Sequence, residues 1–266
     1  MKTLERTHIL AQIVEAKRKR LQVARMRVPE AVVRRMAETV PVAPSFRDAL
    51  TKPQRVRIIA ELKKASPSKG VLTPNLDIEK ISAAYAGAGA VAISVVTEED
   101  FFQGDLGWVS RVRKTRKTAN LPVLRKDFVF DSFQVYETRG AGASAILLIA
   151  AMLDLSQLKD LLALASSVAL DALVEVHDEA ELEEALEAGA AIIGVNNRNL
   201  NTFDVDLQTS YRLASLIPED RLFVVESGIH NRGDVDALLD AGADAFLVGE
   251  HFVTSADPAA AIRGLL

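Results

Sequence analysis

The stretch AGAAIIGV, from Ala188 to Val195, joins a small-residue tripeptide to an apolar run, and the pattern occurs four times in the chain. Ala-Gly-Ala also stands at 88–90, 141–143 and 241–243, each time just before an apolar run. The middle glycines are 53, 47 and 53 residues apart, and each spacing is the length of two strand-plus-helix units. Glycine readily ends a helix, and small residues let a helix approach a strand closely. The repeat therefore predicts four pairs of βα units.

Reading outward from the repeat, short β-branched runs alternate with amphipathic segments of about 10 to 15 residues, as in repeated βα units on a parallel sheet. The chain lacks the Gly-X-Gly-X-X-Gly that usually follows the first strand of a dinucleotide-binding fold, which disfavours an open doubly wound sheet. We therefore predict an α/β fold, a closed (β/α)₈ TIM barrel. The expected strands are Ile58–Leu62, Val91–Val95, Pro122–Lys126, Ser144–Ile149, Ala172–Val176, Ala191–Val195, Leu222–Glu226 and Ala245–Gly249.

The first 57 residues differ from the rest in their predicted structure and in their charge. Helical patterns cover Ile9–Arg25, with Ile9, Ile13, Ala16, Arg20 and Val23 on one side. Two shorter helical segments follow, from Pro29 to about Glu38 and over Ser45–Leu50. The segment carries 14 Lys and Arg against 5 Asp and Glu, and Lys17–Arg20 is a basic cluster. No aromatic residue interleaves it, so we interpret it as a solvated helix face rather than a nucleic-acid patch. We expect a helical extension at 1–57, packed on a single barrel domain at 58–266.

Composition narrows the function further. The 266 residues are 49% apolar and 26% charged, with a net charge of −4, which disfavours disorder and a strongly nucleic-acid-seeking surface. The chain has no cysteine and only four histidines, so disulfides, Cys-ligated metals and thiol nucleophiles are excluded and a histidine-rich metal site is not expected. No apolar run is long enough for a signal peptide or a membrane span, and we expect a cytoplasmic protein.

Polar side chains collect where the predicted strands end, at the face that carries the active site in such barrels. Unpaired charges facing a barrel cost several kcal/mol, so these groups must compensate one another or serve a ligand. A salt-bridge network that closes the barrel is the structural alternative to a catalytic site. The residues are Glu61, Lys63, Lys126, Glu175, Asn196, Glu226 and Ser227.

A phosphate site is the second signal. Ser227-Gly228 follows the seventh strand and Gly249 the eighth, where barrels of this kind often bind phosphate. The loop at 63–70 carries three lysines around Ser66-Pro67-Ser68 and could close over an anionic substrate, which makes Ser66 a candidate ligand. Phe101, Phe102, Phe128 and Leu147 could sandwich an aromatic ring, or could simply pack the rim.

Five motifs in order at strand ends resemble the indole-3-glycerol-phosphate synthase family, over nearly the whole chain. They are ELKKASPSKG (61–70), VLRKDF (123–128), LVEVH (173–177), GVNNRNL (194–200) and VVESGI (224–229). The resemblance implies a barrel of the ribulose-phosphate-binding type. It also implies the decarboxylating ring closure of 1-(2-carboxyphenylamino)-1-deoxyribulose 5-phosphate in tryptophan biosynthesis, with no cofactor and no metal. The expected partner is this phosphorylated small molecule, with no nucleic acid or membrane, and the expected state is a monomer.

The resemblance also implies roles. Lys126 would be the general acid and Glu175 a general base, while Lys63, held by Glu61, would contact the substrate carboxylate. The remaining positions would orient the sugar (Asn196, Glu226, Ser227), line the anion side (Arg198), flank the aromatic ring (Phe102, Phe128, Leu147, Leu200) and bind the phosphate (Ser227, Gly228, Gly249).

Two positions depart from the family pattern. Ala65 stands where some members have lysine, and Glu250 where many have serine. Because an acid beside a phosphate is unfavourable, we expect the Glu250 side chain to point away from the site. Two other functions remain as alternatives. The first is a phosphoribosylanthranilate isomerase, which is disfavoured because that reaction usually uses a Cys/Asp pair and this chain has no cysteine. The second is a non-catalytic barrel that binds a phosphometabolite, which would not need Lys63, Lys126 and Glu175 as acids and base.

Overall fold

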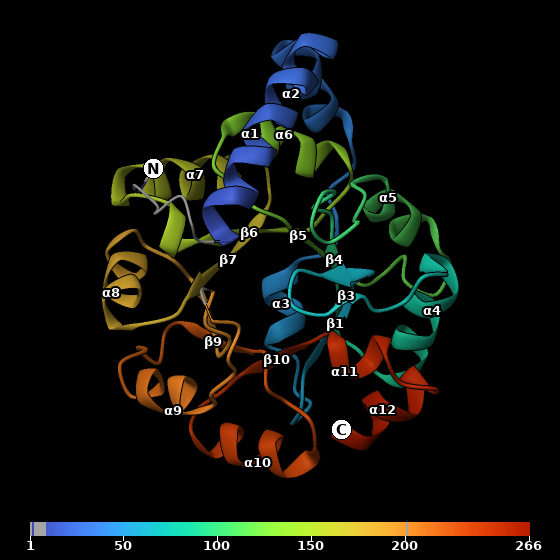
Figure 1. Cartoon of the computed structure of the whole chain (residues 1–266), viewed down its shortest axis with the longest axis vertical. Helices are drawn as coiled ribbons and strands as arrows, with labels where there is room; N and C mark the ends of the chain where they lie inside the picture. The colour runs from blue at the N-terminus through green and yellow to red at the C-terminus, as the bar shows by residue number, and fades with distance from the viewer. Residues whose placement is uncertain (1, 3–8, 201) are drawn as a thin grey trace.

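The computed structural model describes residue 2 and residues 9–200 and 202–266. Eight parallel strands close into a barrel, with a helix after each strand forming an outer ring (Figure 1). This confirms the predicted (β/α)₈ fold, and every predicted strand agrees with an observed one to within one residue at each end. The barrel strands are β1 (Ile58–Leu62), β4 (Ala92–Val96), β5 (Val123–Lys126), β6 (Ala145–Ile149), β7 (Asp171–Val176), β8 (Ile192–Asn196), β9 (Leu222–Glu226) and β10 (Ala245–Val248).

The outer helices begin and end at residues suited to those positions. The four Ala-Gly-Ala glycines all have left-handed backbone angles, between +86° and +106°, which favour glycine where a helix ends. Asp or Asn side chains accept backbone N–H groups at the start of six of the helices. The outer helices are α4 (Ile78–Ala88), α5 (Gly107–Lys114), α6 (Ser132–Gly140), α7 (Leu155–Ser167), α8 (Glu179–Glu187), α9 (Gln208–Ala214), α10 (Arg232–Asp240), α11 (Glu250–Val253) and α12 (Pro258–Leu265).

The strands lie in the order β1, β10, β9, β8, β7, β6, β5, β4 and back to β1. Their apolar side chains form one continuous core with those of the surrounding helices. Two of the loops at the carboxyl ends of the strands contain short regular elements. The loop after β1 contains the antiparallel pair β2 (Ala65–Ser66) and β3 (Gly70–Val71), and the loop after β6 contains the 3₁₀ helix η1 (Ala150–Met152).

The segment before β1 contains three helices that contact the barrel at different places. α1 (Ile9–Arg27) reaches the carboxyl ends of the strands, and α2 (Glu30–Thr39) packs on α6 (Figure 1). α3 (Phe46–Leu50) lies at the opposite end, because the N–H groups of Phe46 and Arg47 donate to Asp171 at the amino end of β7. Of the predicted extension at 1–57, residues 1 and 3–8 lie outside the described residues.

The side of α1 that the helical spacing groups together is only partly the buried one, because it shares just Ile13 with the buried face. The buried residues are Leu10, Ile13, Val14, Lys17 and Leu21, whereas Val23 is 40% exposed. The basic cluster is therefore not wholly solvated, because Lys17 lies inside and forms ion pairs with Glu99 and Asp127. None of the described helices is long and apolar enough to cross a membrane.

Candidate active site

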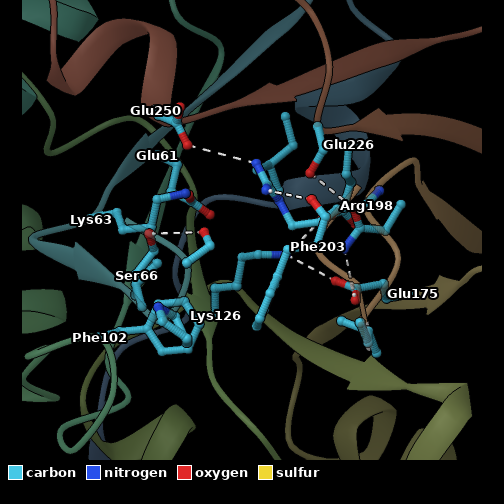
Figure 2. Close-up of a pocket in the computed structure, with 18 of the residues that line it drawn as sticks. Glu61, Lys63, Ser66, Phe102, Lys126, Glu175, Arg198, Phe203, Glu226 and Glu250 are labelled. Carbon is cyan, nitrogen blue, oxygen red and sulfur yellow. Dashed lines mark hydrogen bonds and ion pairs between the residues drawn. The ribbon is translucent and has the colours of Figure 1, made fainter. Parts of the chain in front are cut away.

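One pocket opens at the carboxyl ends of the barrel strands, and the expected site residues line it with the exception of Phe101 (Figure 2). The side chains come from all parts of the chain and converge because parallel strands end at the same face. The lining residues that were expected are Glu61, Lys63, Ser66, Phe102, Lys126, Phe128, Leu147, Glu175, Asn196, Arg198, Leu200, Glu226, Ser227, Gly228 and Gly249.

Lys126, at the end of β5, lies at the centre of the charged group. Its Nζ donates to Glu175 Oε2 at 2.9 Å and to Glu226 Oε2 at 2.6 Å. These carboxylates come from β7 and β9 and are almost fully buried. An ammonium has three N–H donors, so two hydrogen bonds leave one N–H of Lys126 for a ligand.

Burial and ion pairing shift the pKa values of this cluster in opposite directions. Burial alone would lower the pKa of Lys126, but Glu175 and Glu226 outweigh it and raise that pKa above its usual value. Burial would raise the pKa of Glu175, but Lys126 and His177 hold it well below its usual range. For Glu226, burial and the nearby charge of Glu175 prevail over Lys126 and raise the pKa to about 7. Perturbed pKa values at three buried, mutually paired groups are typical of functional sites.

Asn196 links the charged centre to the loop after β9. Its Nδ2 donates to Glu175 Oε1 at 3.1 Å, and its Oδ1 accepts from Ser227 Oγ at 2.9 Å and from the backbone N–H of Arg198 at 3.0 Å. The amide is therefore held by donors and acceptors on both sides. Ser227 has a left-handed φ of 65°, uncommon for a residue with a side chain and typical of functional sites.

A second ion pair lies at the end of β1, where Lys63 Nζ is 2.9 Å from Glu61 Oε1. The other oxygen of Glu61 is buried without a hydrogen-bond partner among the described residues, and the same is true of Glu226 Oε1. A network of salt bridges that simply closes the barrel therefore explains only part of this cluster. The charges compensate one another, yet two buried carboxylate oxygens on pocket-lining residues have no hydrogen-bond partner among the described residues.

Two glycines make room for these carboxylates. A Cβ at Gly194 would overlap Glu226 Oε1, and a Cβ at Gly249 would overlap Glu61 Oε1. Gly249 was expected at the site for phosphate binding only, and Gly194 was not singled out. Its signal in the sequence was a glycine inside an otherwise β-branched strand, which often marks close approach of another group.

An apolar wall faces the charged residues. The rings of Phe102 and Phe128 lie 6.1 Å apart at an interplanar angle of 40°. Leu147 and Leu200 also line the pocket, whereas Phe101 does not. The α1 residues Ile9, Leu10 and Ile13 add apolar surface that sequence reasoning missed, because their helix precedes the barrel by some thirty residues.

The remaining end of the pocket lies around the loops after β9 and β10. Gly228 has a φ of 84°, and His230 and His251 line this end with ring centroids 6.2 Å apart. Neither histidine was expected at the site. Across the described part of the chain, no group of three or more acidic or histidine side chains is placed to hold a metal ion.

Glu250 does not turn away from the pocket as expected. It lines the wall, with Oε2 at 3.6 Å from Arg198 Nη2 (Figure 2). Its Oε1 pairs with Lys69. The physical reason is the two cations, which attract the carboxylate across from the loops after β8 and β1. Burial opposes ionisation of Glu250, but Lys69 and the other nearby cations lower its pKa below the usual value.

Comparison with known proteins decides the family. The family model described as indole-3-glycerol phosphate synthase matches residues 10–265. The chain belongs to the indole-3-glycerol phosphate synthase family. A relative of that name from Dehalococcoides mccartyi is 46% identical, over 97% of this chain and 100% of its own length. Another from Roseiflexus sp. is 47% identical, over 97% of each chain.

Solved structures show the fold more broadly. A 3-hexulose-6-phosphate synthase from Salmonella typhimurium has a TM-score of 0.62 at 16% identity, covering 79% of this chain and 96% of its own. A KGPDC from Streptococcus mutans has a TM-score of 0.62 at 12% identity, covering 80% of this chain and 96% of its own. At these identities the likeness concerns the barrel alone.

As an indole-3-glycerol phosphate synthase, the chain is a decarboxylating lyase of tryptophan biosynthesis. It closes the ring of 1-(2-carboxyphenylamino)-1-deoxyribulose 5-phosphate and releases indole-3-glycerol phosphate, carbon dioxide and water. The substrate is a phosphorylated small molecule with a carboxylate, an aromatic ring and sugar hydroxyls. The pocket offers cations, an apolar wall and polar side chains to match these groups.

Proposed function

We propose that Lys126 is the general acid of this reaction and that Glu175 is its general base. The observation that carries the proposal is the position of the Lys126 ammonium, which is held by Glu175 and Glu226 at the centre of the pocket with one N–H to spare. A cation within hydrogen-bond reach can stabilise charge that develops on a carbonyl oxygen and then donate its proton.

In the first step, the ring carbon that bears the carboxylate attacks the ketone carbon of the sugar chain. The new carbon–carbon bond forms as the carbonyl electrons move to oxygen, and that oxygen takes a proton from Lys126. The ring nitrogen becomes an iminium. Loss of carbon dioxide returns an electron pair to this iminium, so the step as proposed needs neither a metal nor a cofactor.

Dehydration then completes the indole. Lys126, neutral after the first step, first regains a proton from solvent, which is the one proton that the overall reaction consumes. The hydroxyl formed in the first step then leaves as water with a proton from Lys126, and Glu175 takes the proton lost from the new five-membered ring. Glu175 Oε2 is 2.9 Å from Lys126 Nζ, so the base can return this proton to the acid. The short distance supports assigning both roles to one pair.

Lys63 is assigned to the substrate carboxylate, with Glu61 holding its ammonium 2.9 Å away. Asn196, Glu226 and Ser227 orient the sugar hydroxyls, and their position on the pocket wall supports this role. Arg198 lines the anion side of the pocket.

The phosphate is assigned to Ser227, Gly228 and Gly249, where glycine lets backbone N–H groups approach an anion. Ser66 contributes from the loop after β1. The apolar wall of Phe102, Phe128, Leu147 and Leu200 flanks the aromatic ring.

We further propose that the segment at 1–57 serves as a helical extension of one barrel domain at 58–266. Ile9, Leu10 and Ile13 support a part for α1 in covering the substrate. A single chain supplies the complete pocket, which supports a monomer, and a step of tryptophan biosynthesis fits the cytoplasm. Sedimentation at assay concentration tests whether the protein is a monomer, and cell fractionation tests its location.

The decisive experiment is Lys126→Ala. We expect turnover, followed by the fluorescence of indole-3-glycerol phosphate, to be abolished, while binding of the product measured by calorimetry stays within a few-fold of the unmodified protein. Lys114→Ala, an exposed lysine on α5, is the matched control and should leave turnover unchanged. A near-normal rate in Lys126→Ala would show that another group is the acid.

A further inference from the structure

A row of three ionisable side chains leads from α8 to the proposed base. His177 follows β7 directly, and its Nε2 lies 3.3 Å from Glu175 Oε1. Its Nδ1 lies 3.0 Å from Glu181 Oε2 in the first turn of α8, and its backbone N–H donates to the same oxygen at 2.8 Å. The imidazole is therefore fixed on one side by Glu181 and directed toward Glu175 on the other.

His177 stands behind Glu175 rather than in the pocket. It is not among the residues that line the pocket, whereas Glu175 is. Its buried Nε2 makes no hydrogen bond with a described residue, and its one ion-pair contact among the described residues is Glu175 Oε1, so Glu175 is the group that it faces. Any effect of His177 on the reaction must act through Glu175.

We propose that His177 is a positioning residue which, as an imidazolium held by Glu181, orients Glu175 from behind and keeps it ionised during the reaction. This inference rests on the role of Glu175 proposed above. It adds to that role a second cation that never touches the substrate.

The charges around the ring support an imidazolium. Glu175 faces it from β7 and Glu181 from α8, while Lys126 of β5 approaches Glu175 from the pocket side and Glu226 of β9 lies beyond Lys126. Burial alone would lower the pKa of His177, but the two carboxylates outweigh it and raise the pKa to about 10.

The need for this cation follows from the first step of the reaction. When Lys126 passes a proton to the substrate, it becomes neutral and Glu175 loses the cation on its pocket side. A buried carboxylate without a cation favours its protonated form. The imidazolium remains in place on the far side, so Glu175 stays ready to accept the ring proton in the second step.

The test is a double-mutant cycle between His177→Gln and Glu175→Gln, with kcat and KM measured by product fluorescence. In the unmodified background we expect His177→Gln to lower kcat by roughly tenfold, as for strongly coupled neighbours, with KM within twofold. In the Glu175→Gln background we expect the same substitution to lower kcat by less than about twofold. A merely structural role would reduce kcat equally in both backgrounds.

Two further variants keep the test decisive. Glu181→Gln leaves both Glu175 and His177 in place, and we expect it to lower kcat in the same direction and to lower the pKa of His177 seen by imidazole NMR. Glu183→Gln, an exposed acid on the same helix, makes the same charge change and should alter neither.

The outcomes separate the two proposals. An unchanged kcat in His177→Gln, or an equal loss in both backgrounds, overturns the inference and leaves the role of Glu175 standing. Near-normal turnover in Glu175→Gln alone overturns the role of Glu175. If His177→Gln fails to fold, Glu181→Gln decides: a normal kcat with an unshifted His177 overturns the inference.

Discussion

Lys17, on the buried face of α1, lies 2.9 Å from Asp127, the residue that directly follows Lys126. Asp127 also pairs with Arg125, which directly precedes Lys126, at 2.9 Å. The two neighbours of the proposed acid are thus joined to each other, and one of them is joined to a helix outside the barrel. The first helix is therefore coupled to the backbone that carries Lys126.

Breaking this ion pair should weaken both stability and catalysis. Lys17→Met leaves Asp127 buried with one cation fewer, and we expect unfolding free energy to fall by about 3 kcal/mol, as when one partner of a buried pair is removed. We also expect kcat to fall more than KM rises. Lys19→Met, on the exposed side of the same helix, should change stability by less than about 0.5 kcal/mol. Urea unfolding and initial rates measure both, and equal effects of the two substitutions would contradict the coupling.

The raised pKa of Glu226 predicts a pH dependence of stability. In the folded chain this carboxyl keeps its proton up to about pH 7, whereas in the unfolded chain it loses the proton near its ordinary value. The folded state then binds more protons between about pH 4.5 and 7, so the contribution of Glu226 to stability falls as pH rises through this window and is constant above it. Glu226→Gln lacks this titration.

The measurement is urea unfolding of both proteins at several pH values from 5 to 8. We expect the stability of the unmodified protein, relative to Glu226→Gln, to decline up to about pH 7 and then level off. Parallel curves over the whole range would mean that the carboxyl titrates at its ordinary pKa.

Glu250 gives a prediction about substrate affinity. Its carboxylate pairs with Lys69 and Arg198 beside the proposed phosphate site. Glu250→Gln removes the negative charge and frees both cations for the phosphate, so we expect KM to fall by about three- to tenfold with kcat little changed. Inhibition by inorganic phosphate should strengthen in parallel. Glu219→Gln, an exposed acid elsewhere, controls for net charge. A higher KM would instead show that the carboxylate mainly holds the two loops in place.

The barrel and the charged site follow from the sequence because both depend on local pattern. The Ala-Gly-Ala repeat marks helix ends, and polar residues at strand ends must meet at one face in a parallel barrel. The buried face of α1 does not follow, because Lys17 is buried only by virtue of Asp127, which lies 110 residues away. Glu250 was misplaced for the same reason, since its cations come from two other loops. His177 and Glu181 have the spacing of one helical turn, yet their contact with Glu175 depends on how α8 returns to β7.

Gly194 offers the sharpest check on the packing of the site, because its role depends on one side chain. A Cβ there would overlap Glu226 Oε1 and approach Leu173 Cδ1 to 3.1 Å, so Gly194→Ala must displace the carboxylate that holds Lys126. We expect kcat/KM to fall by more than about tenfold, since removing one well-placed interaction at a reacting centre costs at least this much.

Shortening the displaced side chain should separate a clash from a general loss of fold. In the Gly194→Ala background, Glu226→Asp withdraws the carboxylate by one methylene, so we expect it to restore part of kcat/KM, whereas in the unmodified protein the same change should lower it. Gly87→Ala, in α4 with open space around its Cβ, should leave activity unchanged and raise stability by about 0.5–1 kcal/mol. Independent losses in the Gly194→Ala, Glu226→Asp double variant would show that Gly194 acts on the barrel as a whole and not through Glu226.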